Sequence, residues 1–85
     1  MELNDTKELM VSANYKERFK AEYYQTKIRY DKLKSFNNRI EAAQRMQFEE
    51  PKHDCPLDLL KEQQKYMGEY LRTLEIRAII ENVEL

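Results

Sequence analysis

The fold is decided by residues 15–40, YKERFKAEYYQTKIRYDKLKSFNNRI, which contain no glycine or proline. Seven side chains in this stretch alternate at spacings of four and three residues: Phe19, Tyr23, Thr26, Tyr30, Leu33, Asn37 and Ile40. This spacing places them along one side of a helix, as in the seam of a coiled coil. The pattern therefore predicts a long α-helix over about residues 14–46, beginning at Asn14, which has Glu17 at the capping-box distance.

A second run of the same kind follows the last proline. Seven side chains again alternate at spacings of three and four residues: Leu57, Leu60, Gln64, Met67, Leu71, Leu74 and Ala78. Proline is tolerated at the first position of a helix, where its missing N–H is not needed. We therefore expect a second helix over about residues 56–82, with Pro56 as its first residue and Cys55 as its N-cap.

Both prolines fall in residues 47–56, QFEEPKHDCP, so residues 47–55 are expected to connect the two helices. A short connection makes consecutive helices antiparallel neighbours. Near the N-terminus, Asp5 and Glu8 have the capping-box spacing and predict a short helix over about residues 5–11. The expected fold class is therefore all-α, an antiparallel helical hairpin with a short N-terminal helix, in one domain spanning residues 1–85.

Further apolar residues flank both seams, so the apolar face of the hairpin is broader than one partner helix covers. They are Tyr15, Tyr24, Ile28 and Phe36 in the first helix, and Leu59, Tyr66, Tyr70, Ile76, Ile79, Ile80 and Val83 in or just after the second. A chain of 85 residues also buries a small fraction of its surface by itself. We therefore expect the hairpin to assemble into a symmetric homo-oligomeric bundle.

The net charge of -1 conceals an uneven distribution of charge along the chain. Residues 15–45 carry nine Lys/Arg and four Asp/Glu, whereas residues 46–85 carry five Lys/Arg and nine Asp/Glu. Opposite net charges suit two segments that lie against each other, in one chain or in neighbouring copies. A slightly acidic domain binds a polyphosphate backbone poorly, so extended nucleic acid is not an expected partner.

The sequence offers little for catalysis or metal binding. Cys55, His53 and Asp54 stand together in the connection, but one cysteine and one histidine do not supply the four ligands of a structural zinc site. Nucleophilic catalysis would also need a base that a third group holds in place. There is no glycine-rich phosphate loop. We expect a protein that is not an enzyme and that has no metal ion or cofactor.

The chain also lacks the marks of a membrane or exported protein. No stretch approaches the roughly 18 to 20 apolar residues of a membrane span, and the start, MELNDTKEL, has no signal-peptide pattern. A single cysteine fits a reducing compartment. The expected location is the cytoplasm.

Tyrosines and basic residues are interleaved in residues 15–34. One interpretation is that the rings are core and the bases a solvated face that pairs with acids such as Glu22 and Asp31. The other is a ligand pocket between copies, because aromatic rings stack on nucleobases and arginine binds phosphate in a bidentate manner. The second interpretation has ten candidate ligand-binding residues: Tyr15, Arg18, Tyr23, Tyr24, Lys27, Arg29, Tyr66, Tyr70, Arg72 and Arg77.

Two blocks of the chain, YKERFKAEYYQTKIRYDKLK (15–34) and CPLDLLKEQQKYMGEYLRTLEIRAIIENVEL (55–85), resemble small proteins of crAss-like phages and of phages and prophages of Gram-positive hosts. More distantly, the hairpin and LRTLEIRAI (71–79) resemble phage proteins that sequester cyclic-nucleotide or cyclic ADP-ribose signals of the CBASS and Thoeris defences. Those proteins form symmetric oligomers with pockets between subunits. The resemblance implies a non-catalytic sponge for a nucleotide-type signal in the infected bacterial cell.

Two alternatives remain open at this point. A broad helical face also suits a protein-binding inhibitor or adaptor of a host or defence protein. A purely structural coiled-coil protein of a phage has the same helical periodicity. The hypotheses differ in which substitutions would matter, since basic residues serve the sponge and exposed apolar residues serve a protein partner.

Overall fold

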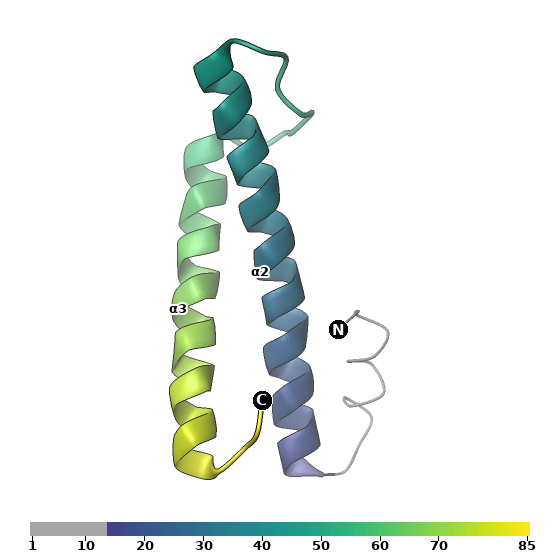
Figure 1. Cartoon of the computed structure of the whole chain (residues 1–85), viewed down its shortest axis with the longest axis vertical. Coiled ribbons are helices and arrows are strands. Elements are labelled where there is room, and N and C mark those ends of the chain that lie inside the picture. Colours follow the sequence, from purple (N-terminus) through teal and green to yellow (C-terminus); the bar gives the residue numbers. More distant parts are fainter. Residues whose placement is uncertain (1–13) are drawn as a thin grey trace.

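The computed structural model describes residues 14–85, and the short helix predicted over about residues 5–11 lies outside them. Helix α2 spans Tyr15–Met46, and helix α3 spans Leu57–Glu81. The two helices run antiparallel side by side, joined by residues 47–56 (Figure 1). This arrangement is the predicted all-helical hairpin. Neither helix is long and apolar enough to cross a membrane, in the part of the chain described.

Both ends of α2 have physical causes that are visible in the backbone. Oδ1 of Asn14 accepts hydrogen bonds from the N–H groups of Lys16 at 2.8 Å and Glu17 at 3.3 Å, which confirms the predicted start. At the other end Gln47 adopts the left-handed conformation with φ 58°, and the N–H of Phe48 donates to the carbonyl of Ala43 at 2.8 Å. The left-handed residue ends the helix.

Helix α3 begins one residue later than the sequence predicted. Pro56 is the N-cap, with an extended ψ of 148°, and its carbonyl accepts from the N–H of Leu60 at 3.2 Å. The prediction that Cys55 caps the helix was wrong, because Cys55 precedes the N-cap residue and no side chain within residues 14–85 caps this end. Asn82, with φ 60°, ends the helix in the left-handed conformation.

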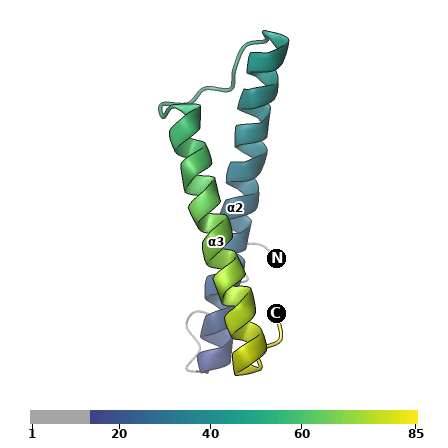
Figure 2. The same cartoon turned by 90° about the vertical axis from the view of Figure 1, so that its left-hand side faces the viewer.

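The core lies at the end of the hairpin opposite the connection. Its buried cluster consists of Phe19, Tyr23, Leu71, Leu74, Ala78 and Val83. Figure 2 shows the helices crossing near this end and separating toward the connection. Because the helices separate, the seam residues of α3 that lie nearer the connection are only half-buried. Ile40 on α2 is nevertheless fully buried. Both predicted seams are confirmed as the lines along which the helices meet.

Two special residues fix how closely and in what register the helices pack. A Cβ atom on Gly68 would lie 3.2 Å from Cε1 of Tyr30, so the glycine leaves room for that ring. The buried amide of Asn37 donates to the carbonyl of Leu60 at 3.2 Å and to the side chain of Gln64 at 3.0 Å. The polar members of the two seams therefore meet each other, as register-setting polar residues do in coiled coils.

Candidate functional site

Two tyrosine–glutamate pairs link the helices on opposite sides of the seam. Tyr23 donates a 2.7 Å hydrogen bond to Glu75, and the neighbouring Glu22 accepts one from Tyr70. Neighbouring residues of an α-helix point about 100° apart. Glu75 and Tyr70 therefore mark the two long sides of the hairpin, which we call the Glu75 side and the Tyr70 side.

The Tyr70 side collects six of the ten predicted ligand-binding residues. On α2, Arg18 lies four residues before Glu22, and Arg29 lies seven residues after it, so all three share one face. On α3, Arg77 lies seven residues after Tyr70, and its Nη2 donates to the hydroxyl of Tyr15 at 3.3 Å. The six are Tyr15, Arg18, Arg29, Tyr66, Tyr70 and Arg77.

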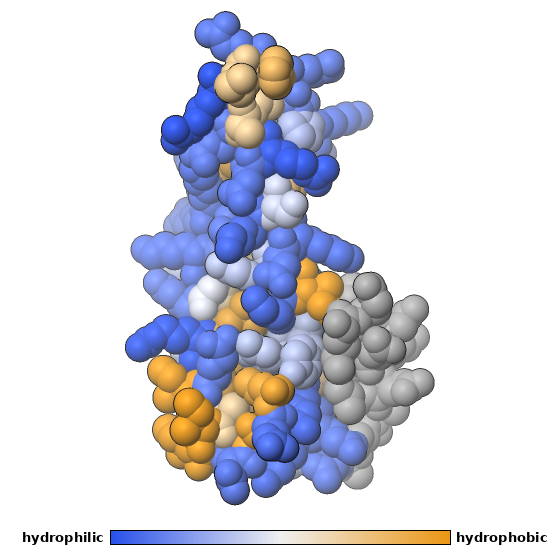
Figure 3. Space-filling model, in the orientation of Figure 1, coloured by the Kyte–Doolittle hydropathy of each residue, from blue (hydrophilic) through white to orange (hydrophobic). Residues whose placement is uncertain are grey.

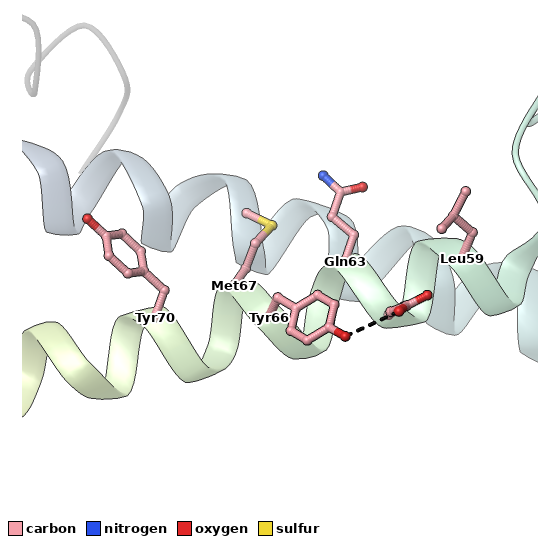
Figure 4. A pocket seen from close by; sticks show the side chains of 6 residues that line it. Leu59, Gln63, Tyr66, Met67 and Tyr70 are labelled. Carbon is pink, nitrogen blue, oxygen red and sulfur yellow. Dashed lines mark hydrogen bonds between the residues drawn. The ribbon is translucent and has the colours of Figure 1, made fainter.

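An open groove of about 610 Å³ runs along α3 on this side. It is lined by Leu59, Glu62, Gln63, Tyr66, Met67 and Tyr70 (Figure 4). Tyr66 and Tyr70 are 57% and 42% exposed, so a flat molecule can reach them. Figure 4 shows Met67 rising from α3 between these two tyrosines. The lining is mostly apolar, as in typical small-molecule sites.

Arg29 lies across the seam from the Tyr70 end of this groove. The contact between Tyr30 and Gly68 and the hydrogen bond between Glu22 and Tyr70 fix the register of the two helices. Arg29 precedes Tyr30, so it is level with the segment between Tyr66 and Tyr70. Its side chain is exposed and forms no ion pair or hydrogen bond with a described residue. The guanidinium is thus available to an anion.

Carboxylates hold the hydroxyl groups of the groove tyrosines. Tyr66 donates to Glu62 at 3.2 Å, one turn away on the same helix. The bond from Tyr70 to Glu22, followed by partial burial, raises the pKa of Tyr70. The phenol of Tyr70 therefore stays protonated at neutral pH. The carboxylates repel a phosphate placed beside them, but they can accept hydrogen bonds from hydroxyl or amino groups of a ligand.

The Glu75 side holds three other predicted residues in a different setting. Tyr23 is 8% exposed, and burial, followed by its bond to Glu75, raises its pKa to about 12. The ring of Tyr24 packs edge-on against that of Tyr23 at 5.2 Å. Lys27 pairs with Asp31 at 3.3 Å. The structure does not bring these three residues to the groove.

Arg72, the last of the ten, does not line the groove either. The seam residues Leu71 and Leu74 face α2, whereas Arg72 is exposed and lies four residues before Ile76 on the outer face of α3. It forms no ion pair or hydrogen bond with the residues that the structure describes. The groove residues Leu59, Glu62, Gln63 and Met67 were not predicted as ligand contacts, because only the three-dimensional groove distinguishes them from other helix positions.

The connection is held by its own side chains. His53 bonds to the carbonyl of Cys55 at 2.6 Å, and its other ring nitrogen lies 3.4 Å from Glu50. The bond to Cys55 is the main reason why the pKa of His53 is raised. No group of three or more His, Cys, Asp or Glu side chains within residues 14–85 could hold a metal ion.

Comparison with known proteins identifies one family. A family model described as Sequestin matches residues 13–80, which include all of α2 and nearly all of α3. No curated protein and no solved structure gives a significant match. The matched segment covers well over half of the chain and includes the whole groove. The chain therefore belongs to the Sequestin family.

Proposed function

We propose that this protein binds and sequesters a nucleotide-derived immune signal, of the cyclic oligonucleotide or cyclic ADP-ribose type, without changing it chemically. The family name is compatible with sequestering a molecule and suggests binding rather than catalysis. The resemblance to phage sponges supplies the class of ligand. In this proposal the protein acts for a phage in the cytoplasm of the infected bacterium.

The observation that carries the proposal is the open groove with two exposed tyrosines opposite Arg29, which has no ion pair or hydrogen bond among the described residues. Stacking of a base on an aromatic ring is worth about 1 to 3 kcal/mol. We assign that contact to Tyr66 and Tyr70. Arg29 would hold phosphate through its two parallel N–H donors. Glu62 would accept hydrogen bonds from the ribose hydroxyl groups of a nucleotide. Inorganic phosphate has no such groups.

The groove lies on one helix and is open to solvent, so a ligand bound there needs a second surface to cover it. Small-molecule sites usually bury about 70–90% of the ligand. We propose that other copies of the chain supply this cover within a symmetric homo-oligomer. Arg18, at the core end of the Tyr70 side, would then add positive charge around the bound signal, whereas Arg77 already pairs with Glu81 at 2.7 Å.

Isothermal titration with cyclic ADP-ribose and with a cyclic dinucleotide tests the proposal. Arg29→Ala is expected to weaken binding by about tenfold or more, because a charge-assisted phosphate contact is lost. Lys34→Ala is the matched control, since Lys34 is an exposed base of α2 that lies on the other side of the seam and has no described partner. Tyr66→Ala should weaken binding as well, whereas Tyr66→Phe, which keeps the ring, should not.

Equal affinity of wild type, Arg29→Ala and Tyr66→Ala would remove the groove from the proposal. Absence of binding by the wild-type oligomer to either nucleotide would favour the other candidate function, an inhibitor or adaptor that binds a protein. Circular dichroism on each variant separates loss of binding from loss of the helices.

A further inference from the structure

The connection between the helices carries the only histidine of the chain, His53, and both nitrogens of its ring face hydrogen-bond acceptors. Nδ1 lies 2.6 Å from the carbonyl oxygen of Cys55, and Nε2 lies 3.4 Å from Oε1 of Glu50. A carbonyl group and an ionised carboxylate can only accept hydrogen bonds, so each contact requires a proton on the ring nitrogen. Only the doubly protonated, positively charged ring can therefore donate to both partners.

The surroundings of this imidazole favour its charged form. Its side chain is 20% exposed and packs edge-on against the ring of Phe36 on α2, with the ring centroids 6.3 Å apart. The hydrogen bond to Cys55 is the main cause of its raised pKa, partial burial opposes the rise, and the carboxylates of Glu50 and Asp54 add to it. From α2, Arg39 lies over the Phe36 ring at 5.8 Å but forms no hydrogen bond with the imidazole. No charged side chain of α3 bonds to it either, within the described residues.

The contacts of His53 tie the connection to both helices at the end of the hairpin that is remote from the core. Glu50 also accepts a 2.9 Å hydrogen bond from Gln44 in the last turn of α2, and Cys55 directly precedes Pro56, the N-cap of α3. The buried cluster lies at the opposite end. Figure 3 shows that the connection end, at the top, is mainly hydrophilic, whereas hydrophobic surface gathers toward the core end. Local stability at the connection therefore depends mainly on polar contacts.

We propose that the connection is a pH-sensitive clasp, which is closed when His53 is doubly protonated and opens when the ring loses one proton to the solvent. In the closed form the ring donates to Cys55 and Glu50 together, and this holds residues 50–55 in one arrangement. The 2.6 Å bond keeps the remaining proton of the neutral ring on Nδ1. Nε2 then turns a lone pair toward the carboxylate of Glu50, which repels it. Histidine suits this role because its ordinary pKa of 6.5 lies near neutral pH.

The direction of the pH dependence follows from the raised pKa of His53. The folded protein holds the proton more tightly than the unfolded chain, whose histidine has the ordinary pKa of 6.5. The stabilisation by the closed clasp is therefore fully present below about pH 6.5. It is lost as the pH rises through the higher pKa of the folded state. The clasp needs no ligand, so it is tested separately from the proposed function.

An NMR titration of the ¹⁵N-labelled protein between about pH 5 and 9 tests the clasp without any substitution. All histidine ring signals belong to His53, because the chain has one histidine. Their midpoint is expected above 6.5. The backbone order parameter of Cys55 should fall with the same midpoint, because the connection becomes more mobile when the clasp opens. Leu74, which is 1% exposed in the core, is the internal control and should keep its order parameter.

Two glutamine variants of the connection separate the clasp from a general effect of charge. Glu50→Gln keeps an oxygen that can accept from Gln44 but removes the charge beside the ring, so the midpoint of His53 should fall. Glu49→Gln is the matched control, since it removes the same charge from the neighbouring exposed residue and should leave the midpoint unchanged. In His53→Gln, the order parameter of Cys55 should be the same at both ends of the pH range.

Three results would overturn the inference. The first is a wild-type midpoint at or below 6.5, and the second is an equal midpoint in the wild type and the Glu50→Gln variant. The third is an order parameter of Cys55 that does not follow the titration of His53. Circular dichroism shows whether each variant keeps its helices, and the wild-type titration decides the question even if a variant does not.

Discussion

The hydroxyl of Tyr23 donates a 2.7 Å hydrogen bond to Oε2 of Glu75, across the seam between α2 and α3. This bond lies beside the buried cluster at the core end of the hairpin. On the other side of the seam, the bond from Tyr70 to Glu22 runs in the opposite direction between the helices. The two pairs therefore hold α3 on both sides and position the groove that lies next to Tyr70.

Removal of the Tyr23 hydroxyl tests how much this bond stabilises the hairpin. Tyr23→Phe keeps the buried ring and leaves Glu75 exposed to water, so the expected loss in free energy of unfolding is about 0.5–1.5 kcal/mol. Urea unfolding measures it. Tyr66→Phe is the control, because the bond from Tyr66 to Glu62 joins residues of one helix and both are exposed. Equal stability of the two variants would contradict the assigned role.

The same tyrosine predicts a loss of stability in alkali. Its pKa is raised from an ordinary value of 10.0 to about 12 in the folded protein, so the folded state holds the proton more tightly than the unfolded chain. The resulting stabilisation is fully present below about pH 10 and is lost as the pH rises through about 12. Between these values the wild type should lose more free energy of unfolding than Tyr23→Phe. If urea unfolding shows that both proteins lose the same free energy of unfolding, another group is responsible for the loss of stability in alkali.

The close approach at Gly68 predicts that a larger residue there is harmful. A Cβ would already lie 3.2 Å from the Tyr30 ring, so Gly68→Ile forces that ring to move and is expected to cost about 1–3 kcal/mol. In a Tyr30→Ala background the space is free, and the same change should cost less. A double-mutant cycle of thermal or urea unfolding gives the coupling free energy between positions 30 and 68. Additive effects would mean that the two residues do not constrain each other.

The hydrogen-bonded seam residues Asn37 and Gln64 should determine the register of the two helices rather than stabilise the hairpin. Oδ1 of Asn37 is buried without a hydrogen-bond partner among the described residues, which carries a desolvation cost. Asn37→Leu combined with Gln64→Leu is therefore expected to leave the free energy of unfolding unchanged or raise it by about 1–2 kcal/mol. The same variant should show more than one helix pairing in its NMR spectrum. A destabilised protein with a single sharp set of signals would contradict this view.

The helices were predictable because their causes are local. The seam spacing, the Asn14 cap and the prolines each act within a few residues, and the structure confirms the hairpin that they predicted. The start of α3 was misplaced by one residue, since proline fits both the N-cap and the first helical position by its fixed φ. Helix ends commonly differ by one or two residues for such reasons.

The site was only partly predictable because it depends on contacts between distant residues. The spacing of Glu62 and Tyr66 is visible in the sequence, but the partners of Tyr23 and Tyr70 lie on the other helix. The pairing register decides those partners, and with them which bases lie near the groove. Arg29 and Lys27 are two residues apart, yet they fall on different sides of the seam.

Native mass spectrometry of the protein purified from a bacterium with an active nucleotide-signalling defence tests the central claim most directly. We predict an oligomer that carries a few hundred daltons of extra mass per site, which is released on denaturation and identified as a nucleotide. The Arg29→Ala protein from the same cells should carry less nucleotide than the wild type, and the Lys34→Ala protein should carry as much as the wild type. An oligomer with no small ligand, from cells in which the signal is demonstrably present, would contradict the claim.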